Sequence, residues 1–183
     1  MFYYFYYSFR LRVYRFLIKK EKQFDTFIMN EDLNQEIKSN KQYNPQMHSA
    51  EHILNQTMVR MFNRGRSFSN HIEKKKSKCD YHFDRPLTDK EIDTIQSTVN
   101  RVIESDLPVR EEFLSREEAQ AQYTLERLPE EMGNQIRIIR VGDYDACPCI
   151  GPHVKSTGEI GGFRILSSSF EDGVLRIRFK LGG

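Results

Sequence analysis

The sequence has no tryptophan, only three cysteines and no long hydrophobic run. An odd, small number of cysteines without a recognisable signal peptide argues against a disulfide framework and predicts a reducing, cytoplasmic location. The hydrophobic runs are far shorter than the ~20 residues of a membrane helix, so we predict no association with a membrane. Residues 29–183 contain no internal repeat and no low-complexity linker. These absences favour a compact globular domain over a repeat, membrane or secreted disulfide-rich protein.

Charge is unevenly distributed along the chain. The formal net charge is +2, from 28 Lys and Arg and 26 Asp and Glu. Residues 1–28 contain six of the basic and two of the acidic residues. Residues 29–183 therefore contain 22 basic and 24 acidic residues, a net charge of −2. A slightly acidic domain can hold nucleic acid only through local basic patches.

The first 28 residues differ from the rest. An aromatic run without periodicity, residues 2–9, precedes the basic residues, which is the reverse of the order in a signal peptide. We predict two parts: an N-terminal extension over residues 1–28, disordered or upstream of a true start at Met29, and a domain over residues 29–183. An amphipathic surface anchor is the alternative for the extension.

Helix and strand signals alternate from residue 44 onward. Capping residues followed by apolar residues at three- and four-residue spacing predict helices over 45–63, from 88 to the proline at 108, and over 116–123. Alternating apolar residues predict strands within 71–84, 109–114 and 136–141, and a hairpin over 163–181. The mixture predicts an α+β domain, with helices packed on a mostly antiparallel sheet.

Four residues in two segments suit a transition metal. Prolines and glycines between residues 145 and 162 exclude a helix, so we predict a shaped loop that holds Cys149 and His153. His48 and His52 are four residues apart and share a face of the first predicted helix. Thiolate and imidazole bind zinc tetrahedrally. We therefore predict zinc at these four residues. We interpret the extra thiol of Cys147 as a small strand-end residue, with competition for the metal as the alternative.

Three motifs resemble a known family. His48-Ser-Ala-Glu-His52, Cys149-Ile-Gly-Pro-His-Val154 and Thr157-Gly-Glu-Ile-Gly161 are similar to motifs of the editing domain of alanyl-tRNA synthetases, of its free-standing relatives and of the second additional domain of threonyl-tRNA synthetases. The resemblance extends from about residue 48 to the C-terminus. It implies a zinc-dependent, trans-acting hydrolase that deacylates mischarged tRNA. No obligate protein partner is evident from the sequence. No catalytic side chain beyond the zinc is defined.

The motifs point to two substrate classes. Gly151-Pro-His153 is closer to the threonyl-type domain, whereas the Thr157 motif followed by Phe163 is closer to the alanyl type. We predict Ser-tRNA(Ala) or Gly-tRNA(Ala) as substrate, with Ser-tRNA(Thr) as the alternative. A zinc-stapled tRNA-binding module without chemistry, and a different zinc hydrolase on the same fold, are the other hypotheses.

Two basic patches could hold the tRNA. One is the run Lys74, Lys75 and Lys76, and the other is Arg176 and Arg178 on one side of a predicted strand. Both are also typical of solvated surface. We predict that they contact tRNA phosphates, because a slightly acidic domain must bind RNA through local charge.

Overall fold

The structure is a computed structural model that describes residues 44–126, 128 and 133–182. The predicted extension over residues 1–28 and the predicted start at Met29 lie outside these residues, and the predicted boundary between the two parts stays a prediction. The described residues from Asn44 onward belong to one compact unit.

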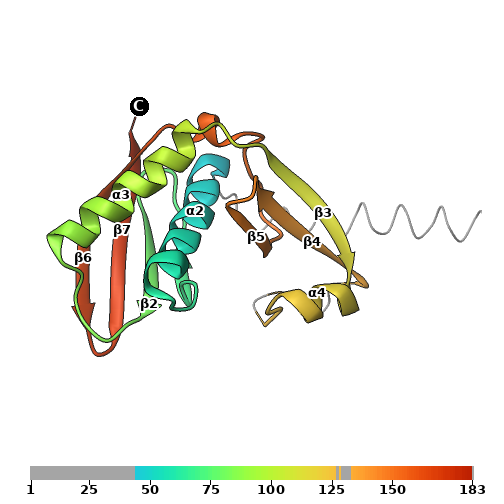
Figure 1. The fold of residues 1–183 in the computed structure, drawn as a ribbon, viewed down its shortest axis with the longest axis horizontal. Helices are drawn as coiled ribbons and strands as arrows, with labels where there is room; N and C mark the ends of the chain where they lie inside the picture. The colour runs from blue at the N-terminus through green and yellow to red at the C-terminus, as the bar shows by residue number, and fades with distance from the viewer. Residues whose placement is uncertain (1–43, 127, 129–132, 183) are drawn as a thin grey trace, which may run out of the picture. The chain divides into compact units, whose positions relative to one another are not determined.

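The described part of the chain contains three α-helices, a 3-10 helix and seven strands (Figure 1). The helices are α2 (Pro45–Phe62), α3 (Asp89–Glu104), α4 (Arg116–Gln122) and the 3-10 helix η1 (Thr157–Ile160). The strands are β1 (Ser69–His71), β2 (Ser77–His82), β3 (Val109–Ser115), β4 (Gln135–Val141), β5 (Asp145–Pro148), β6 (Gly162–Glu171) and β7 (Val174–Gly182).

The strands form two antiparallel sheets. The larger has the order β1-β2-β7-β6 and the smaller the order β3-β4-β5. The predicted α+β class with antiparallel pairing is confirmed. The division into two sheets was not predicted, because it depends on pairings such as that of β2 with β7, nearly a hundred residues apart in the sequence.

Local signals set the limits of α2. The side chain of Asn44 accepts a hydrogen bond from the backbone N–H of Met47 at 2.9 Å, and Pro45 fills the first helical position, where no N–H is needed. The helix ends at Asn63, whose φ of 50° is the left-handed conformation that stops a helix. The predicted helix over residues 45–63 is thus present to within one residue.

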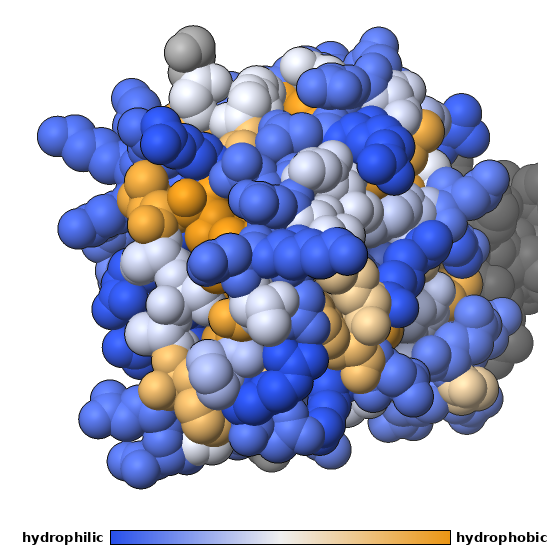
Figure 2. All heavy atoms as spheres, turned by 60° about the vertical axis from the view of Figure 1, so that its left-hand side comes forward, coloured by the Kyte–Doolittle hydropathy of each residue, from blue (hydrophilic) through white to orange (hydrophobic). Residues whose placement is uncertain are grey.

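The main hydrophobic core lies between the larger sheet and the helices α2 and α3, which lie side by side in Figure 1. Ile53 and Leu54 of α2, Ile95 of α3, and Ile177 and Phe179 of β7 are all fully buried. A smaller core forms where α4 packs on β3 and β4. The face shown in Figure 2 is mostly hydrophilic, with small, separate hydrophobic patches. No helix among the described residues is long and apolar enough to cross a membrane.

The stretch from residue 145 to residue 162 is more regular than predicted. Asp145–Pro148 forms β5, paired with β4, and Thr157–Ile160 forms η1, so the prediction of a loop throughout was wrong for these eight residues. A proline fits β5 because β5 is at the edge of its sheet, where a missing N–H leaves no neighbouring strand unsatisfied. The irregular part is the segment between β5 and η1, and it carries Cys149 and His153.

Candidate metal centre

Helix α2 holds one half of the candidate site. His48 and His52 are one turn apart, and both are buried, with 8% and 3% of their surface exposed. Their ring centroids are 5.3 Å apart. A buried imidazole needs polar partners, and both rings find theirs on the segment around β5.

Strand β5 brings the other half to α2. Side chains two residues apart on an extended chain point to the same side. Asp145, Cys147 and Cys149 are so spaced, and each lies against a histidine of α2: Asp145 and Cys147 against His52, and Cys149 against His48. His153 follows at the end of the turn begun by Pro148.

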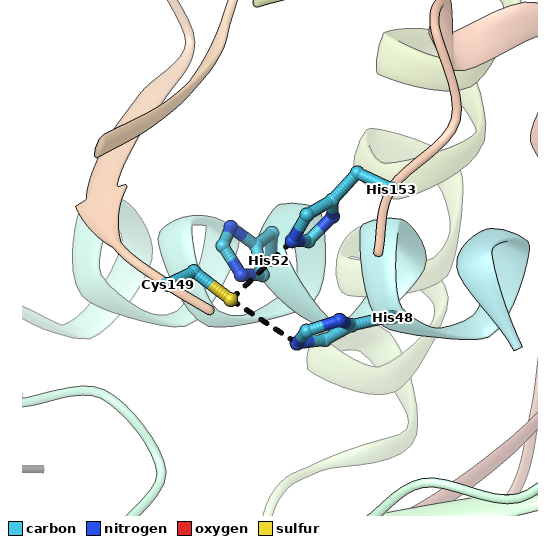
Figure 3. Close-up of side chains that lie close together, drawn as sticks. All are labelled: His48, His52, Cys149 and His153. Atoms are coloured by element: carbon cyan, nitrogen blue, oxygen red, sulfur yellow. Dashed lines mark hydrogen bonds between the residues drawn. The ribbon is translucent and has the colours of Figure 1, made fainter. Parts of the chain in front are cut away.

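The four predicted ligand residues come together (Figure 3). Cys149 Sγ lies 3.4 Å from His48 Nε2 and 3.3 Å from His153 Nε2, and each residue offers one donor atom within 4.8 Å of the other three. Two ligand atoms of a tetrahedral zinc are about 3.3 to 3.6 Å apart, given Zn–N and Zn–S bonds of about 2.0 to 2.3 Å. The cluster of His48, His52, Cys149 and His153 therefore has the size and the donor chemistry of a tetrahedral metal site.

Backbone groups of the loop orient His48. Its Nδ1 lies 3.2 Å from the carbonyl oxygen of Pro152, so Nδ1–H donates to that oxygen and Nε2 is left to face Cys149. Gly151 lies so close to the ring that a Cβ built on it would be 2.2 Å from His48 Cε1. The loop thus closes over His48 in a way that only glycine permits.

Ser49 orients His153. Its Oγ lies 3.1 Å from His153 Nδ1 and accepts a hydrogen bond from the backbone N–H of Val154 at 3.2 Å. With the proton on Nδ1 directed to Ser49, His153 presents Nε2 to Cys149. Ser49 follows His48 directly on α2, so the helix supplies a ligand residue for the site and positions another that comes from the loop.

His52 is held by a carboxylate that is itself held by an arginine. Its Nδ1 lies 3.6 Å from Asp145 Oδ2 and 3.3 Å from Cys147 Sγ. Arg66 donates to both oxygens of Asp145, at 2.8 and 3.0 Å, and to the backbone oxygen of His52 at 3.4 Å. Asp145, Cys147 and His52 form a second group with metal-binding side chains, but the guanidinium occupies both oxygens of Asp145.

Glu51 belongs to a polar network on the other side of His52. Its Oε1 accepts hydrogen bonds from the side chains of Asn55 and Asn70, at 2.5 and 2.6 Å, and its Oε2 lies 4.0 Å from His52 Nε2. Asn55 also accepts from the backbone N–H of Ser67 at 2.8 Å. The network fixes β1 and the preceding segment along α2.

Protonation of the cluster follows from these contacts. Burial alone would raise the pKa of Cys149, but the imidazoles of His153, His48 and His52 around its sulfur lower that pKa to about 2. Burial lowers the pKa of His153 to about 4. Cys149 as thiolate and His153 as neutral imidazole are the forms that bind metal. Burial also acts to lower the pKa of His52, but the charge of Cys147 and a hydrogen bond to Asp145 outweigh it and raise that pKa. A metal must displace the proton of His52, which makes binding pH-dependent.

Replacement of Asp145 by asparagine should lower metal affinity by about 10- to 100-fold, because a carboxylate behind a metal-binding histidine fixes its orientation and raises its basicity. Competition with a chromophoric chelator measures the affinity. Asp143→Asn is the control, since Asp143 is exposed and lies two residues before Asp145. Equal affinities of the two variants would contradict a positioning role for Asp145.

The five predicted tRNA-contacting residues belong to the larger sheet and to the connection between β1 and β2, not to the segments that carry the ligands. Lys74, Lys75 and Lys76 are exposed in the connection between β1 and β2. Arg176 and Arg178 alternate on β7 with the buried Ile177 and Phe179, so they lie on the face turned away from the helices. Arg176 donates to both carboxylate oxygens of Asp80, at 2.7 Å each. RNA contact by all five stays a prediction.

The prediction from sequence missed the residues that orient the ligands. Asp145, Arg66, Ser49 and Gly151 carry no motif that assigns this role. A partial signal was available for Asp145 and Cys147, since their two-residue spacing with Cys149 places three metal-binding side chains on one side of an extended segment.

Comparison with known proteins agrees with the geometry. Residues 136–178 match the threonyl and alanyl tRNA synthetase second additional domain. The match runs from β4 into β7 and includes Cys149 and His153, whereas His48 and His52 precede it.

Curated relatives point to the alanyl branch. The chain is 34% identical over 140 residues to the alanine–tRNA ligase of Aeropyrum pernix, covering 74% of this chain and 15% of the relative. It is 38% identical over 105 residues to that of Halorubrum lacusprofundi (56% and 11%) and 32% identical over 123 residues to that of Coxiella burnetii (67% and 14%). The chain thus spans only a small part of these relatives. The resemblance is confirmed: this is a protein similar to the editing domain of alanyl-tRNA synthetases.

Proposed function

We propose that this chain is a zinc-dependent hydrolase that deacylates mischarged tRNA in the cytoplasm, with Ser-tRNA(Ala) or Gly-tRNA(Ala) as substrate. The observation that carries the proposal is the cluster of His48, His52, Cys149 and His153 in a chain similar to alanine–tRNA ligases. Ser-tRNA(Thr) remains the alternative substrate, because the family model that matches covers threonyl as well as alanyl synthetases.

The chemistry would take place on the loop side of the cluster. Zinc bound there would polarise the ester carbonyl or lower the pKa of a bound water to about 7. His48 and His52 are buried, whereas Cys149 and His153 are partly exposed and the neighbouring Ile150 is 38% exposed. The 3′ end of the tRNA would therefore approach from the side of Cys149 and His153. Four protein ligands close a zinc site, so one of these two would loosen, the ion would gain a fifth ligand, or zinc would only position the substrate.

The lysine run follows a segment that is hydrogen-bonded to α2. Ser67 bonds to Asn55 and Asn70 bonds to Glu51, so the chain from residue 67 to residue 70 runs against the direction of α2. The connection that follows carries Lys74 to Lys76 and leads into β2, which runs antiparallel to β1. Lys78 of β2 lies opposite Arg178 of β7, which extends the positive charge onto the sheet. Phosphates near the 3′ end of the tRNA are the partners that we propose for this charge.

Replacement of Arg178 by glutamate should flatten the salt dependence of tRNA binding. Each phosphate contact contributes a slope of about 0.7 to 0.9 in log affinity against log salt, so loss of one contact reduces the slope by that amount. Filter binding at several salt concentrations measures it. Arg101→Glu on α3 is the matched control, because Arg101 is exposed on a helix that packs on the other face of the sheet. A slope equal to that of the unchanged protein would remove Arg178 from the RNA-binding surface.

The deciding experiment for the function supplies mischarged tRNA to the 183-residue chain. Hydrolysis of Ser-tRNA(Ala), Gly-tRNA(Ala) and Ser-tRNA(Thr) is measured with zinc, after chelation, and after zinc is restored. We expect the two alanine tRNAs to be deacylated faster than the threonine tRNA, and chelation to abolish the activity reversibly. Metal-loaded protein that hydrolyses none of the three defeats the proposal. In that case salt-dependent tRNA binding would favour the zinc-stapled binding module.

A further inference from the structure

Two thiols flank Pro148: Cys149, which is one of the predicted metal ligands, and Cys147, which is not. Cys147 and Cys149 are two residues apart on an extended segment, and both side chains face α2. Both cysteines are partly exposed, in contrast to Cys79, which is fully buried in the core. Taken as whole residues both thus have some surface open to solvent, although within its group with His52 and Asp145 Cys147 is buried.

The two thiols have different partners. Cys149 Sγ lies 3.4 Å from His48 Nε2 and 3.3 Å from His153 Nε2, within the four-residue cluster. Cys147 Sγ lies 3.3 Å from His52 Nδ1, on the side of that ring where Asp145 also lies. When a metal engages Cys149, Cys147 is the thiol that stays available.

We propose that Cys147 and Cys149 form an oxidation site for hydroperoxides, at which a disulfide removes Cys149 from the metal. The sulfur of Cys147 gives up its proton and attacks the outer oxygen of the hydroperoxide, which breaks the O–O bond and leaves a sulfenic acid and an alcohol, or water from hydrogen peroxide. Cys149 then leaves the metal and attacks the sulfur of Cys147, which releases water. In sum, two thiols are oxidised to one disulfide while one peroxide is reduced.

The spacing lies at the upper limit for this bond, so the segment must shorten slightly to form it. Two extended residues span at most about 6.6 to 7.2 Å between Cα atoms, and disulfides require about 4.4 to 6.8 Å. A disulfide that closes so short a loop is strained, and strained disulfides are readily reduced by cellular thiols. Oxidation would thus be reversible, and it would take away one of the four ligands for as long as it lasts.

The test treats the metal-loaded chain with hydrogen peroxide and follows two quantities that do not depend on deacylation. We expect intact mass to fall by about 2 Da, the loss of two hydrogens. A chromophoric chelator should take up the metal over the same time course. Dithiothreitol with added zinc should restore both, and peptide mapping should place the bond between Cys147 and Cys149.

Cys147→Ser is the decisive variant, because it keeps all four residues of the cluster and a polar atom facing His52. Untreated, it should bind metal like the unchanged protein; treated, it should form no disulfide and keep its metal. Cys147→Ala checks the result should the serine variant fold poorly.

Release of metal from the treated variant as fast as from the unchanged protein would overturn the proposal. Loss of metal before treatment would also overturn it, since Cys147 would then be a ligand. A gain of about 16 Da, as in a sulfenic acid, or about 32 Da, as in a sulfinic acid, without a disulfide in the unchanged protein would overturn the proposal.

Discussion

Cys149→Ala and His52→Ala proteins should each lose nearly all bound metal, while the unchanged chain should retain about one zinc, the content of a single tetrahedral site. Each replacement leaves three donors and a gap in a mostly buried cluster. Structural zinc depends on a complete ligand set for most of its binding free energy, which reaches about 10 to 16 kcal/mol. Elemental analysis after dialysis against a weak chelator measures the content.

His71→Ala is the matched control for the histidine variant. His71 is exposed and pairs with Glu73 on the surface, away from the cluster. Full metal content in both ligand variants would eliminate the site. Retention in Cys149→Ala together with loss in Cys147→Ala would instead identify Cys147 as the sulfur ligand.

The elements that the sequence predicted best are those set by local chemistry. Helix α2 was predicted to within one residue because its two ends are set by Asn44, Pro45 and Asn63. The predicted hairpin turns between β6 and β7 at Asp172 and Gly173, a residue pair that favours tight turns. Their φ values of 48° and 78° are the left-handed conformations that such a turn requires. The pairing of strands into two sheets depends on distant contacts that no local pattern encodes.

The same distinction holds within the site. His48 and His52 could be placed on one face because the helical repeat fixes their spacing, and Cys149 and His153 could be joined to them because their chemistry is alike. The hydrogen bonds that orient them come from Asp145, held by Arg66, and from backbone atoms of the loop. Those contacts arise only when α2 and β5 pack together, so the ligands were predictable and their supports were not.

The position of Cys147 beside His52 was not predicted from the sequence. Interpreted alone, it is a small residue at the end of a strand, and β5 does contain it near its end. The structure places its sulfur 3.3 Å from His52 Nδ1, a separation like those inside the metal cluster. An extended segment that carries Asp145, Cys147 and Cys149 against one helix makes a site with more donors than one zinc uses.

Gly151→Ala should weaken metal binding strongly although it removes no ligand. The added Cβ would lie 2.2 Å from His48 Cε1 and 2.5 Å from His48 Nδ1, well inside van der Waals contact. The loop cannot easily retreat, because Arg137 donates to the backbone oxygens of Gly151 and Cys149 at 2.8 and 3.1 Å. The ring of His48 must therefore turn away, and it loses its bond to Pro152.

We expect the metal affinity of Gly151→Ala to fall by about 100-fold. This is the upper end of the range seen when the orientation of a metal ligand is disturbed. Gly65→Ala carries the same substitution at a glycine where an added Cβ meets nothing within 4 Å, so it should bind metal normally. Chelator competition on both variants, with circular dichroism to verify folding, makes the comparison. If a folded Gly151→Ala protein bound metal as tightly as Gly65→Ala, then His48 would not be held by the loop in the way that its contacts indicate, and its place among the ligands would have to be given up.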